Sequence, residues 1–331
     1  MRPCDACGSR SVRPLLVNRL HSYQLDGQAA EWRYNLLACE DCGLAFVDPE
    51  PGWELIQTFY GDDYGPYDAQ LGPPEKEAYS FKYRIARKRY RPAGKSGPGA
   101  VLDRATAEAV ELGTGKRVSF SLGLPLQLPK DAHIFELGYG SGNWLLAMAE
   151  LGYRNLYGYD IDANPNSEHR LRQAGVTVWH GEFLKETYPA GFLDCIRLEH
   201  AFEHLLDPIA VLKKCRSMLK PGGWLVMNFP ARGSWSEVVS LEDHPTLDLP
   251  RHLYRHTPES TRLILIASGF SPVAIEPYPV AAHLTMVVNA WRERSGRRPI
   301  PLRVGDVMAP GYALFSRLTG RGEHITAWAT A

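Results

Sequence analysis

The segment FELGYGSGN, Phe135 to Asn143, carries three glycines at alternating positions. The apolar run HIF leads into it, and GNWLLAMAEL (142–151), which has helical spacing, follows it. This pattern predicts a buried strand, a tight turn and then a helix. Because glycines let the backbone approach a ligand closely at such a turn, we expect a binding site at the end of this strand.

Two nucleotide-binding motifs are excluded by their spacing. A phosphate-binding P-loop requires Lys and then Ser or Thr after its last glycine, but Asn143 and Trp144 follow here. The dinucleotide fingerprint requires a glycine where this chain has Asn143. A carboxylate, Glu136, stands two residues before the first glycine and suits a cation better than a pyrophosphate. The turn therefore favours a cofactor with a positively charged aminoacyl end.

From about residue 129 onward, short apolar runs alternate with helical patterns. The expected strands are HIFELG (133–138), NLYGYD (155–160), TVWHGE (177–182), LDCIRLEHAF (193–202), WLVMNFP (224–230) and, last, GEHITAWATA (322–331). Helices are expected at 142–151 and at 165–175, the second of which ends at Gly175. A third helix is expected between the fourth and fifth strands, ending at KPGG (220–223). This alternation predicts an α/β fold, a Rossmann-like sheet with helices on both faces.

A second carboxylate, Asp160, ends the strand NLYGYD. In dinucleotide folds an acid at this position accepts hydrogen bonds from ribose hydroxyls. Taken together, the segments FELGYGSGNWLLAMAELG (135–152), LYGYDID (156–162) and DPIAVLKKCRSMLKPGGWLVMNFP (207–230) resemble a class I S-adenosylmethionine (SAM)-dependent methyltransferase. The resemblance covers roughly Pro129 to the C-terminus.

The resemblance implies roles for individual residues. The glycines would line the methionine end of SAM, Asp160 would hold the ribose, and Ile161 would pack beside the adenine. Glu182 and Phe183, after the third strand, would border the adenine. Residues that end the fourth strand would pass under the sulfonium. The implied cofactor-binding residues are Glu136, Gly138, Gly140, Gly142, Asp160, Ile161, Glu182, Phe183, Leu198, Glu199 and, at the sulfonium, His200.

Two C-x2-C pairs lie near the start of the chain, Cys4 with Cys7 and Cys39 with Cys42, each followed by glycine. Four soft thiolates favour tetrahedral zinc, and a closed four-cysteine site leaves no open position for chemistry. We therefore expect a structural Zn²⁺ in a zinc-ribbon module over residues 1–48. A redox dithiol is the weaker alternative, because it does not require a matching second pair.

A four-cysteine module joined to a class I methyltransferase resembles bacterial enzymes that modify sugar nucleotides, glycans and natural products. Sugar C-methyltransferases among them carry a Glu-His pair after the fifth strand. In DLPRHLYRHTPES (248–260), His252 matches the histidine, but Arg251 stands where the glutamate would be. The expected acceptor is a small or sugar-linked molecule, and both O- and C-methylation stay open.

Methyl transfer to a hydroxyl or a carbon acid requires alignment of the acceptor and removal of a proton. Histidine is the natural base near neutral pH. The candidate catalytic residues are His252, His200, His204 and Tyr254. For Tyr254, a hydrogen bond to substrate and a packing role both stay open. Glu203 and His204 are also interpreted as the start of the next helix, with capping and packing roles.

Residues 49–128 form a stretch rich in tyrosine, proline and charge, predicted to be a helical linker or lid before a methyltransferase domain over 129–331. Tyr60, Tyr64 and Tyr67 resemble a lid that folds over the active site, with a surface loop as the equal alternative. The basic stretch SFKYRIARKRYR (80–91) is interpreted first as a solvated helix. A site for an anionic substrate group, formed by Arg84 and Arg87, is the alternative.

Composition and charge limit the classes of partner that the sequence suggests. The 331 residues carry 37 basic and 37 acidic side chains, so the overall charge indicates no polyanionic partner or anionic membrane surface. No apolar run approaches the length of a membrane span, and the polar start is unlike a signal peptide, so we expect a cytoplasmic protein. A homodimer is compatible with the sequence. An RNA methyltransferase that uses the zinc ribbon for recognition is the alternative function, and the absence of a basic stripe between the cysteine pairs argues against it.

Overall fold

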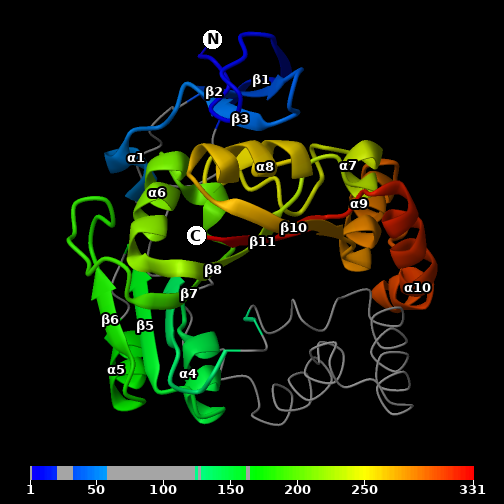
Figure 1. The fold of residues 1–331 in the computed structure, drawn as a ribbon. Coiled ribbons are helices and arrows are strands. Elements are labelled where there is room, and N and C mark those ends of the chain that lie inside the picture. Colours follow the sequence, from blue (N-terminus) through cyan, green and yellow to red (C-terminus); the bar gives the residue numbers. More distant parts are fainter. Residues whose placement is uncertain (1, 21–32, 58–123, 126–127, 162–164) are drawn as a thin grey trace.

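The computed structural model describes residues 2–20, 33–57, 124–125, 128–161 and 165–331. Tyr60, Tyr64 and Tyr67 and the basic stretch with Arg84 and Arg87 lie outside these residues. The described chain forms a small four-stranded sheet, which contains the N-terminal strands, above a larger seven-stranded sheet (Figure 1).

The seven-stranded sheet is Rossmann-like and confirms the predicted fold class. Its strands are β4 (His133–Leu137), β5 (Asn155–Asp160), β6 (Thr177–His180), β7 (Leu193–Glu199), β8 (Leu219–Pro230), β10 (Ser271–Tyr278) and β11 (His324–Thr330). They are ordered β10-β11-β8-β7-β4-β5-β6. β11 pairs antiparallel with both neighbours, and the pairs from β8 to β6 are parallel. The expected last strand is thus present, inserted between β8 and β10.

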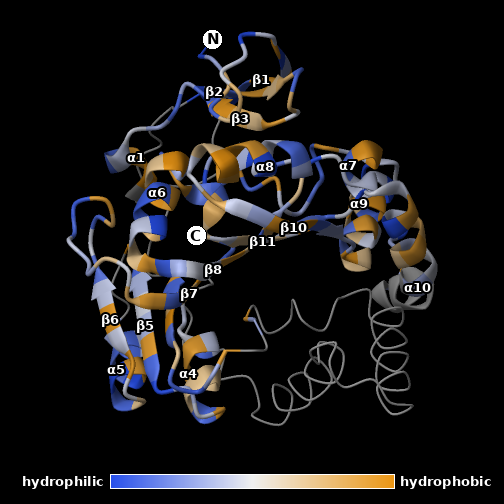
Figure 2. Cartoon of the chain, viewed as in Figure 1, coloured by the Kyte–Doolittle hydropathy of each residue, from blue (hydrophilic) through white to orange (hydrophobic). Residues whose placement is uncertain are grey.

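Helices cover both faces of this sheet. Successive strand residues point to opposite faces, so Ile134 packs with α4 (Asn143–Glu150) and α5 (Pro165–Gln173), whereas Phe135 packs with α6 (Pro208–Met218) and α8 (Pro258–Ala267). Hydrophobic and hydrophilic residues are interspersed along these helices (Figure 2). The remaining helices, α7 (Trp235–Val239), α9 (Ala281–Arg294) and α10 (Leu302–Thr319), gather beyond the β10 edge (Figure 1). None of the described helices is long and apolar enough to span a membrane.

Three expected boundaries of elements after β7 and α6 differ in the structure. The strand predicted for residues 193–202 ends at Glu199, because the next residue, His200, has a positive φ of 51° that breaks the extended backbone. Glu203 and His204 do not begin the next helix but lie in a short 3₁₀ turn, η2 (Phe202–His204). The helix α6 starts only at Pro208, where the Asp207 carboxylate caps it by accepting the Ala210 N–H at 2.8 Å. That helix also ends earlier than expected, at Met218, and KPGG belongs to β8.

The small sheet combines strands from two distant parts of the sequence. Its order is β1-β2-β3-β9, where β1 (Val12–Leu20), β2 (Arg33–Cys39) and β3 (Ala45–Asp48) come from the cysteine-bearing segment and β9 (Tyr254–Arg255) comes from beyond β8. Phe46 pairs with Tyr254 across β3 and β9. The N-terminal module therefore shares a sheet with the segment that directly follows His252.

The module and the larger sheet also share one hydrophobic core. Phe46 is fully buried and belongs to the same cluster as Phe135 of β4 and Phe229 of β8. The backbone continues this connection, because the Leu253 carbonyl accepts the Val47 N–H at 3.0 Å and the Leu253 N–H donates to the Glu203 carbonyl at 2.9 Å. The module is thus tied by hydrogen bonds and packing to the turn that carries Glu203.

We predict that Phe46→Ala lowers the free energy of unfolding of the whole chain by about 3–5 kcal/mol, the usual cost of deleting a buried phenyl group. Denaturant unfolding measures it. Val17→Ala, at a side chain 61% exposed on β1, is the control and should change the value by less than about 0.5 kcal/mol. An equally small effect of Phe46→Ala would show that the module does not stabilise the larger domain.

Candidate active site

The order of the strands places a crevice between β4 and β7. From β4 the chain continues to β5 and β6 on one side, and from β7 it continues to β8 on the other. Open α/β sheets bind ligands at such a reversal, outside the carboxyl ends of the strands. A cavity of about 730 Å³ lies there, lined by the glycine turn after β4 and by the residues after β7. Its size is typical of a small-molecule site.

The glycine turn depends on conformations that other residues rarely adopt. Gly138, Gly140 and Gly142 have φ values of 80°, 51° and 73°. A Cβ on Gly138 would lie 2.8 Å from the Ala201 Cβ, and one on Gly142 would lie 2.8 Å from the Leu171 side chain. Gly138 and Gly140 line the cavity, whereas Gly142 packs against α5 and starts α4. The turn thus keeps the backbone exposed to a ligand.

Asp160 is held at the carboxyl end of β5 and faces this turn. Its Oδ2 accepts the Gly140 N–H at 2.7 Å, and its Oδ1 accepts the Ile161 N–H at 2.9 Å. Both Asp160 and Ile161 line the cavity. Because each carboxylate oxygen has two lone pairs, Asp160 can fix the turn and still accept hydrogen bonds from a ligand hydroxyl.

Glu136 has a partner that the sequence analysis missed. Arg197 of β7, aligned with Glu136 in the parallel register, forms a buried ion pair with it. The same guanidinium pairs with Glu199 at 2.9 Å and lies over the Trp144 ring, 4.4 Å from its centroid. Burial raises the pKa of Glu136 to about 8, against the opposing effect of Arg197. An arginine within an apolar strand, IRLE, was the available signal for this buried pair.

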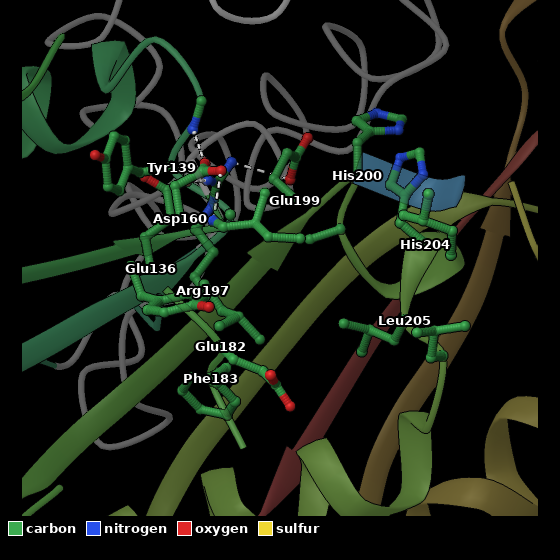
Figure 3. Close-up of a pocket in the computed structure, with 18 of the residues that line it drawn as sticks. Glu136, Tyr139, Asp160, Glu182, Phe183, Arg197, Glu199, His200, His204 and Leu205 are labelled. Atoms are coloured by element: carbon green, nitrogen blue, oxygen red, sulfur yellow. Dashed lines mark hydrogen bonds and ion pairs between the residues drawn. The ribbon is translucent and has the colours of Figure 1, made fainter. Parts of the chain in front are cut away.

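The residues that follow β6 add apolar side chains to the cavity wall. Glu182 and Phe183 line it after β6, next to Leu184. Glu136, Asp160, Glu182 and Phe183 lie on one side of the close-up, and His200 and His204 lie on the other (Figure 3). Leu198 is fully buried in the sheet and does not line the cavity.

The start of the predicted lid region reaches this site. Trp53 and Ile56 come from α1 (Trp53–Gln57), directly after the cysteine module, and both line the cavity. The N-terminal third of the chain therefore contributes to the walls of the site.

At the end of the cavity away from the glycine turn, several histidines surround the carboxylate of Glu203. Glu203 is fully buried. Its Oε1 atom lies 3.4 Å from His200 Nδ1 and 4.0 Å from His252 Nε2. Neither of its carboxylate oxygens accepts a hydrogen bond from the described residues. One donor atom from each of Glu203, His204 and His252 lies within 4.8 Å of the others. His200, His204 and His252 line the cavity. Three of the residues predicted to be catalytic therefore lie together.

The charges in this cluster follow from burial and from the neighbouring groups. Burial alone would raise the pKa of Glu203, but the imidazoles around it, His200 foremost, lower it to about 2. Burial lowers the pKa of His204, and burial together with His204 lowers the pKa of His252 to about 4. For His200 the lowering by burial is outweighed by Glu203, which raises the pKa. At neutral pH the cluster thus holds an ionised carboxylate beside two neutral imidazoles.

Tyr254, the fourth residue predicted to be catalytic, lies elsewhere. It is buried on β9, its hydroxyl donates to the Leu206 carbonyl at 3.3 Å, and the Arg2 guanidinium lies 5.7 Å from its ring centroid. It does not line the main cavity. In this structure Tyr254 packs the module against η2 and α6.

The four cysteines of the module converge on one point. Cys4 and Cys42 have their Sγ atoms 3.5 Å apart, as do Cys7 and Cys39, and all four Sγ atoms lie within 4.8 Å of one another. Tetrahedral zinc with bonds of about 2.3 Å places its sulfurs roughly 3.8 Å apart. Gly8 and Gly43, with φ of 73° and 76°, form the turns that follow Cys7 and Cys42. The residues therefore fit a four-thiolate metal site.

Comparison with known proteins identifies the class. Residues 105–275, just over half of the chain, match the model of a methyltransferase domain family. The chain belongs to this family. The family match, the Rossmann-like sheet and the glycine turn together identify the protein as a class I SAM-dependent methyltransferase, as predicted.

The matches to individual proteins are partial. An uncharacterized 37.1 kDa protein in transposon TN4556 of Streptomyces fradiae is 30% identical over 48% of this chain and 46% of its own length. A ubiquinone biosynthesis O-methyltransferase of Paraburkholderia xenovorans is 31% identical over 28% of this chain and 41% of its own. The chain thus spans less than half the length of these relatives. A SAM-dependent methyltransferase structure from Mesorhizobium loti is 18% identical, covers 62% of this chain and 94% of its own, and has a TM-score of 0.42.

The residues of the cavity fit SAM. The cofactor has a positively charged amino group at its methionine end and a ribose. The cavity offers Asp160 and the Oε2 atom of Glu136, which is buried and has no hydrogen-bond donor among the described residues. Phe183 and Leu184 supply an apolar wall for a purine ring. When bound, SAM supplies an electrophilic methyl group.

We predict that Gly138→Ala raises the dissociation constant for SAM at least about tenfold, a loss of about 1.4 kcal/mol or more. The added Cβ would displace the turn from Ala201. Gly152→Ala is the matched control, because Gly152 also has a positive φ, 91°, but its Cβ would meet nothing within 4 Å. Calorimetric titration measures both. Equal affinities for the two variants would show that the turn does not contact the cofactor.

Proposed function

We propose that the protein transfers the methyl group of SAM to a small-molecule or sugar-linked acceptor, by O- or C-methylation, in glycan or natural-product biosynthesis. One observation carries this proposal: a single cavity joins the glycine turn to the histidine cluster. The cofactor and a group able to remove an acceptor proton can therefore act in the same space. The names of the curated relatives, ubiquinone biosynthesis O-methyltransferases, support O-methylation.

In the proposed complex, SAM occupies the side of the cavity with Glu136 and Asp160. Gly138 and Gly140 approach the methionine end, the Asp160 carboxylate accepts hydrogen bonds from the ribose, and Phe183 packs on the adenine. The contacts of Asp160 with the turn support this, because they orient the carboxylate before the cofactor binds. Glu199 and His200, at the end of β7, would then lie near the sulfonium.

The acceptor would enter from the side of His204 and His252. Trp53 and Ile56 also line the cavity. As the acceptor loses its proton to the histidine cluster, its oxygen or carbon forms a bond to the methyl carbon. The bond from that carbon to sulfur breaks, and its electron pair stays on sulfur as a neutral thioether.

Incubation of the full chain with SAM tritiated in its methyl group tests the proposal. The acceptors would be phenols, sugar nucleotides and, for the alternative function, bulk transfer RNA. Label transferred to a phenol or a sugar nucleotide supports the proposal. Label transferred to RNA alone would replace it with the alternative, and saturable SAM binding with no transfer to either class would contradict the acceptor assignment.

We predict that His252→Ala reduces turnover with the acceptor found in that screen by at least about a hundredfold, since positioned proton transfer contributes about 10²–10⁴-fold. SAM affinity should stay within about threefold of the wild type, because His252 lies on the acceptor side of the cavity. His169→Ala, at an exposed position on α5, is the control. A normal turnover number in His252→Ala would remove His252 from the mechanism.

We further propose that Cys4, Cys7, Cys39 and Cys42 hold a structural zinc ion in a module over residues 1–48. The distances between the sulfurs support this. The hydroxyl of Thr257, which caps α8, donates to the Cys42 carbonyl at 2.7 Å and so links the metal-binding turn to the methyltransferase domain. The proposed role of zinc is to hold the module, and with it β9, in place.

We predict that Cys7→Ser, which removes one ligand, weakens zinc retention and speeds hydrogen exchange at the amides of Val47 and Leu253. The amides around the glycine turn should keep their protection, because the turn is held by β5 instead. Cys215→Ala, at a buried thiol outside the cluster, is the control. Exchange measured by mass spectrometry would contradict the proposal if Cys7→Ser left residues 246–256 as protected as in the wild type.

A further inference from the structure

We propose that Glu203, His204 and His252 form a second metal site, for a divalent first-row transition ion, at the acceptor end of the cavity. The inference rests on the proposed function only for the use of the ion; the site itself is argued from the side chains alone. It is a separate group from the four cysteines of the module.

The hydrogen bonds of the two histidines define which nitrogen faces the carboxylate. His204 Nδ1 lies 2.9 Å from the Arg251 carbonyl, and His252 Nδ1 lies 2.8 Å from the Thr246 carbonyl. A carbonyl can only accept, so each Nδ1 carries the proton. In the neutral imidazoles, each Nε2 therefore has a lone pair. Metal-binding histidines are held in this way, with the second ring nitrogen donating to a carbonyl.

Glu203 makes the arrangement unfavourable without a cation. Its carboxylate is fully buried and accepts no hydrogen bond from the described residues. His252 Nε2, 4.0 Å from Oε1, presents a lone pair to it and not a proton. Buried charges are normally paired, hydrogen-bonded or bound to a metal. The half-exposed His200, 3.4 Å away, is the nearest group able to carry a compensating proton.

The donor set indicates the kind of ion. Two imidazoles and one carboxylate suit Zn²⁺, Fe²⁺ or Mn²⁺, and a site with three protein ligands keeps positions open for water or substrate. The three donor atoms lie within 4.8 Å of one another, so small side-chain movements would bring each to bonding distance of one ion. His204 and His252 line the cavity, whereas Glu203 lies beneath them, so the open positions would face the acceptor.

Such an ion would change the assignment of roles. His204 and His252 would hold the metal, and an acceptor oxygen on the open position would lose its proton more readily. The proton would pass to His200, which also lines the cavity and whose side chain is 43% exposed. The acceptor class is then one with an oxygen able to bind a metal, such as a catechol, a hydroxy acid or a sugar diol.

Manganese binding to the full chain tests the site without SAM or acceptor. Mn²⁺ is a hard ion that prefers oxygen and nitrogen to thiolates, so it distinguishes this site from the four cysteines. Loss of the free Mn²⁺ signal in electron paramagnetic resonance should show one ion bound per chain. Glu203→Gln and His252→Gln, both close in shape to the native residues, should each weaken binding at least about tenfold, and His169→Gln should not.

Two results would overturn the proposal. One is binding that is unchanged in both Glu203→Gln and His252→Gln while these variants keep their wild-type circular dichroism. The other is absence of Mn²⁺ binding at millimolar concentration in the wild type, together with metal analysis that finds no transition ion beyond the one held by the cysteines. Methyl transfer that persists in thoroughly chelated, zinc-ribbon-intact protein would reject the metal's role in catalysis while leaving the proposed methyltransferase function in place.

Discussion

The parallel pairing of β4 with β7 is the constraint on which the site depends. These strands are neighbours in the sheet, but the chain leaves them in opposite directions, so the space beyond their carboxyl ends is not covered by a crossover. Their register sets Glu136 beside Arg197 and brings Ala201 against Gly138. The glycine turn and the histidine cluster, which line the two ends of the cavity, meet at this pair of strands.

The part of the site that the sequence predicted is the part governed by local rules. A strand, a turn that needs positive φ and a helix are specified within about fifteen residues, and only glycine adopts such φ values without strain. The glycine spacing alone separated this turn from the two phosphate-binding motifs. Asp160 could be placed for the same reason, because it ends the strand next to β4 and the ends of parallel strands lie together.

What the sequence did not predict depends on contacts between distant segments. β9 contains only two residues, too few for a periodic pattern, and it forms because β3 offers a free edge to it. The meeting of Glu203 and His252, in segments about fifty residues apart, depends on the hydrogen bonds of Leu253 to both β3 and η2. His200 has a backbone conformation uncommon for a residue with a side chain, and no pattern of apolar residues specifies it.

Two buried carboxylates, Glu136 in the cavity wall and Glu203 beneath His204 and His252, have different partners. Glu136 contacts the guanidinium of Arg197. Arg197 also pairs with Glu199 and lies over the Trp144 ring. Glu136 therefore has a positively charged partner within the protein. Glu203, in the described part of the chain, meets only imidazoles. Since an uncompensated buried charge costs several kcal/mol, its retention points to a cation that arrives from outside or a proton held on His200. The two ends of the cavity differ in this respect: Glu136 has a guanidinium as its partner, whereas the nearest group to Glu203 that can carry a positive charge is the imidazole of His200.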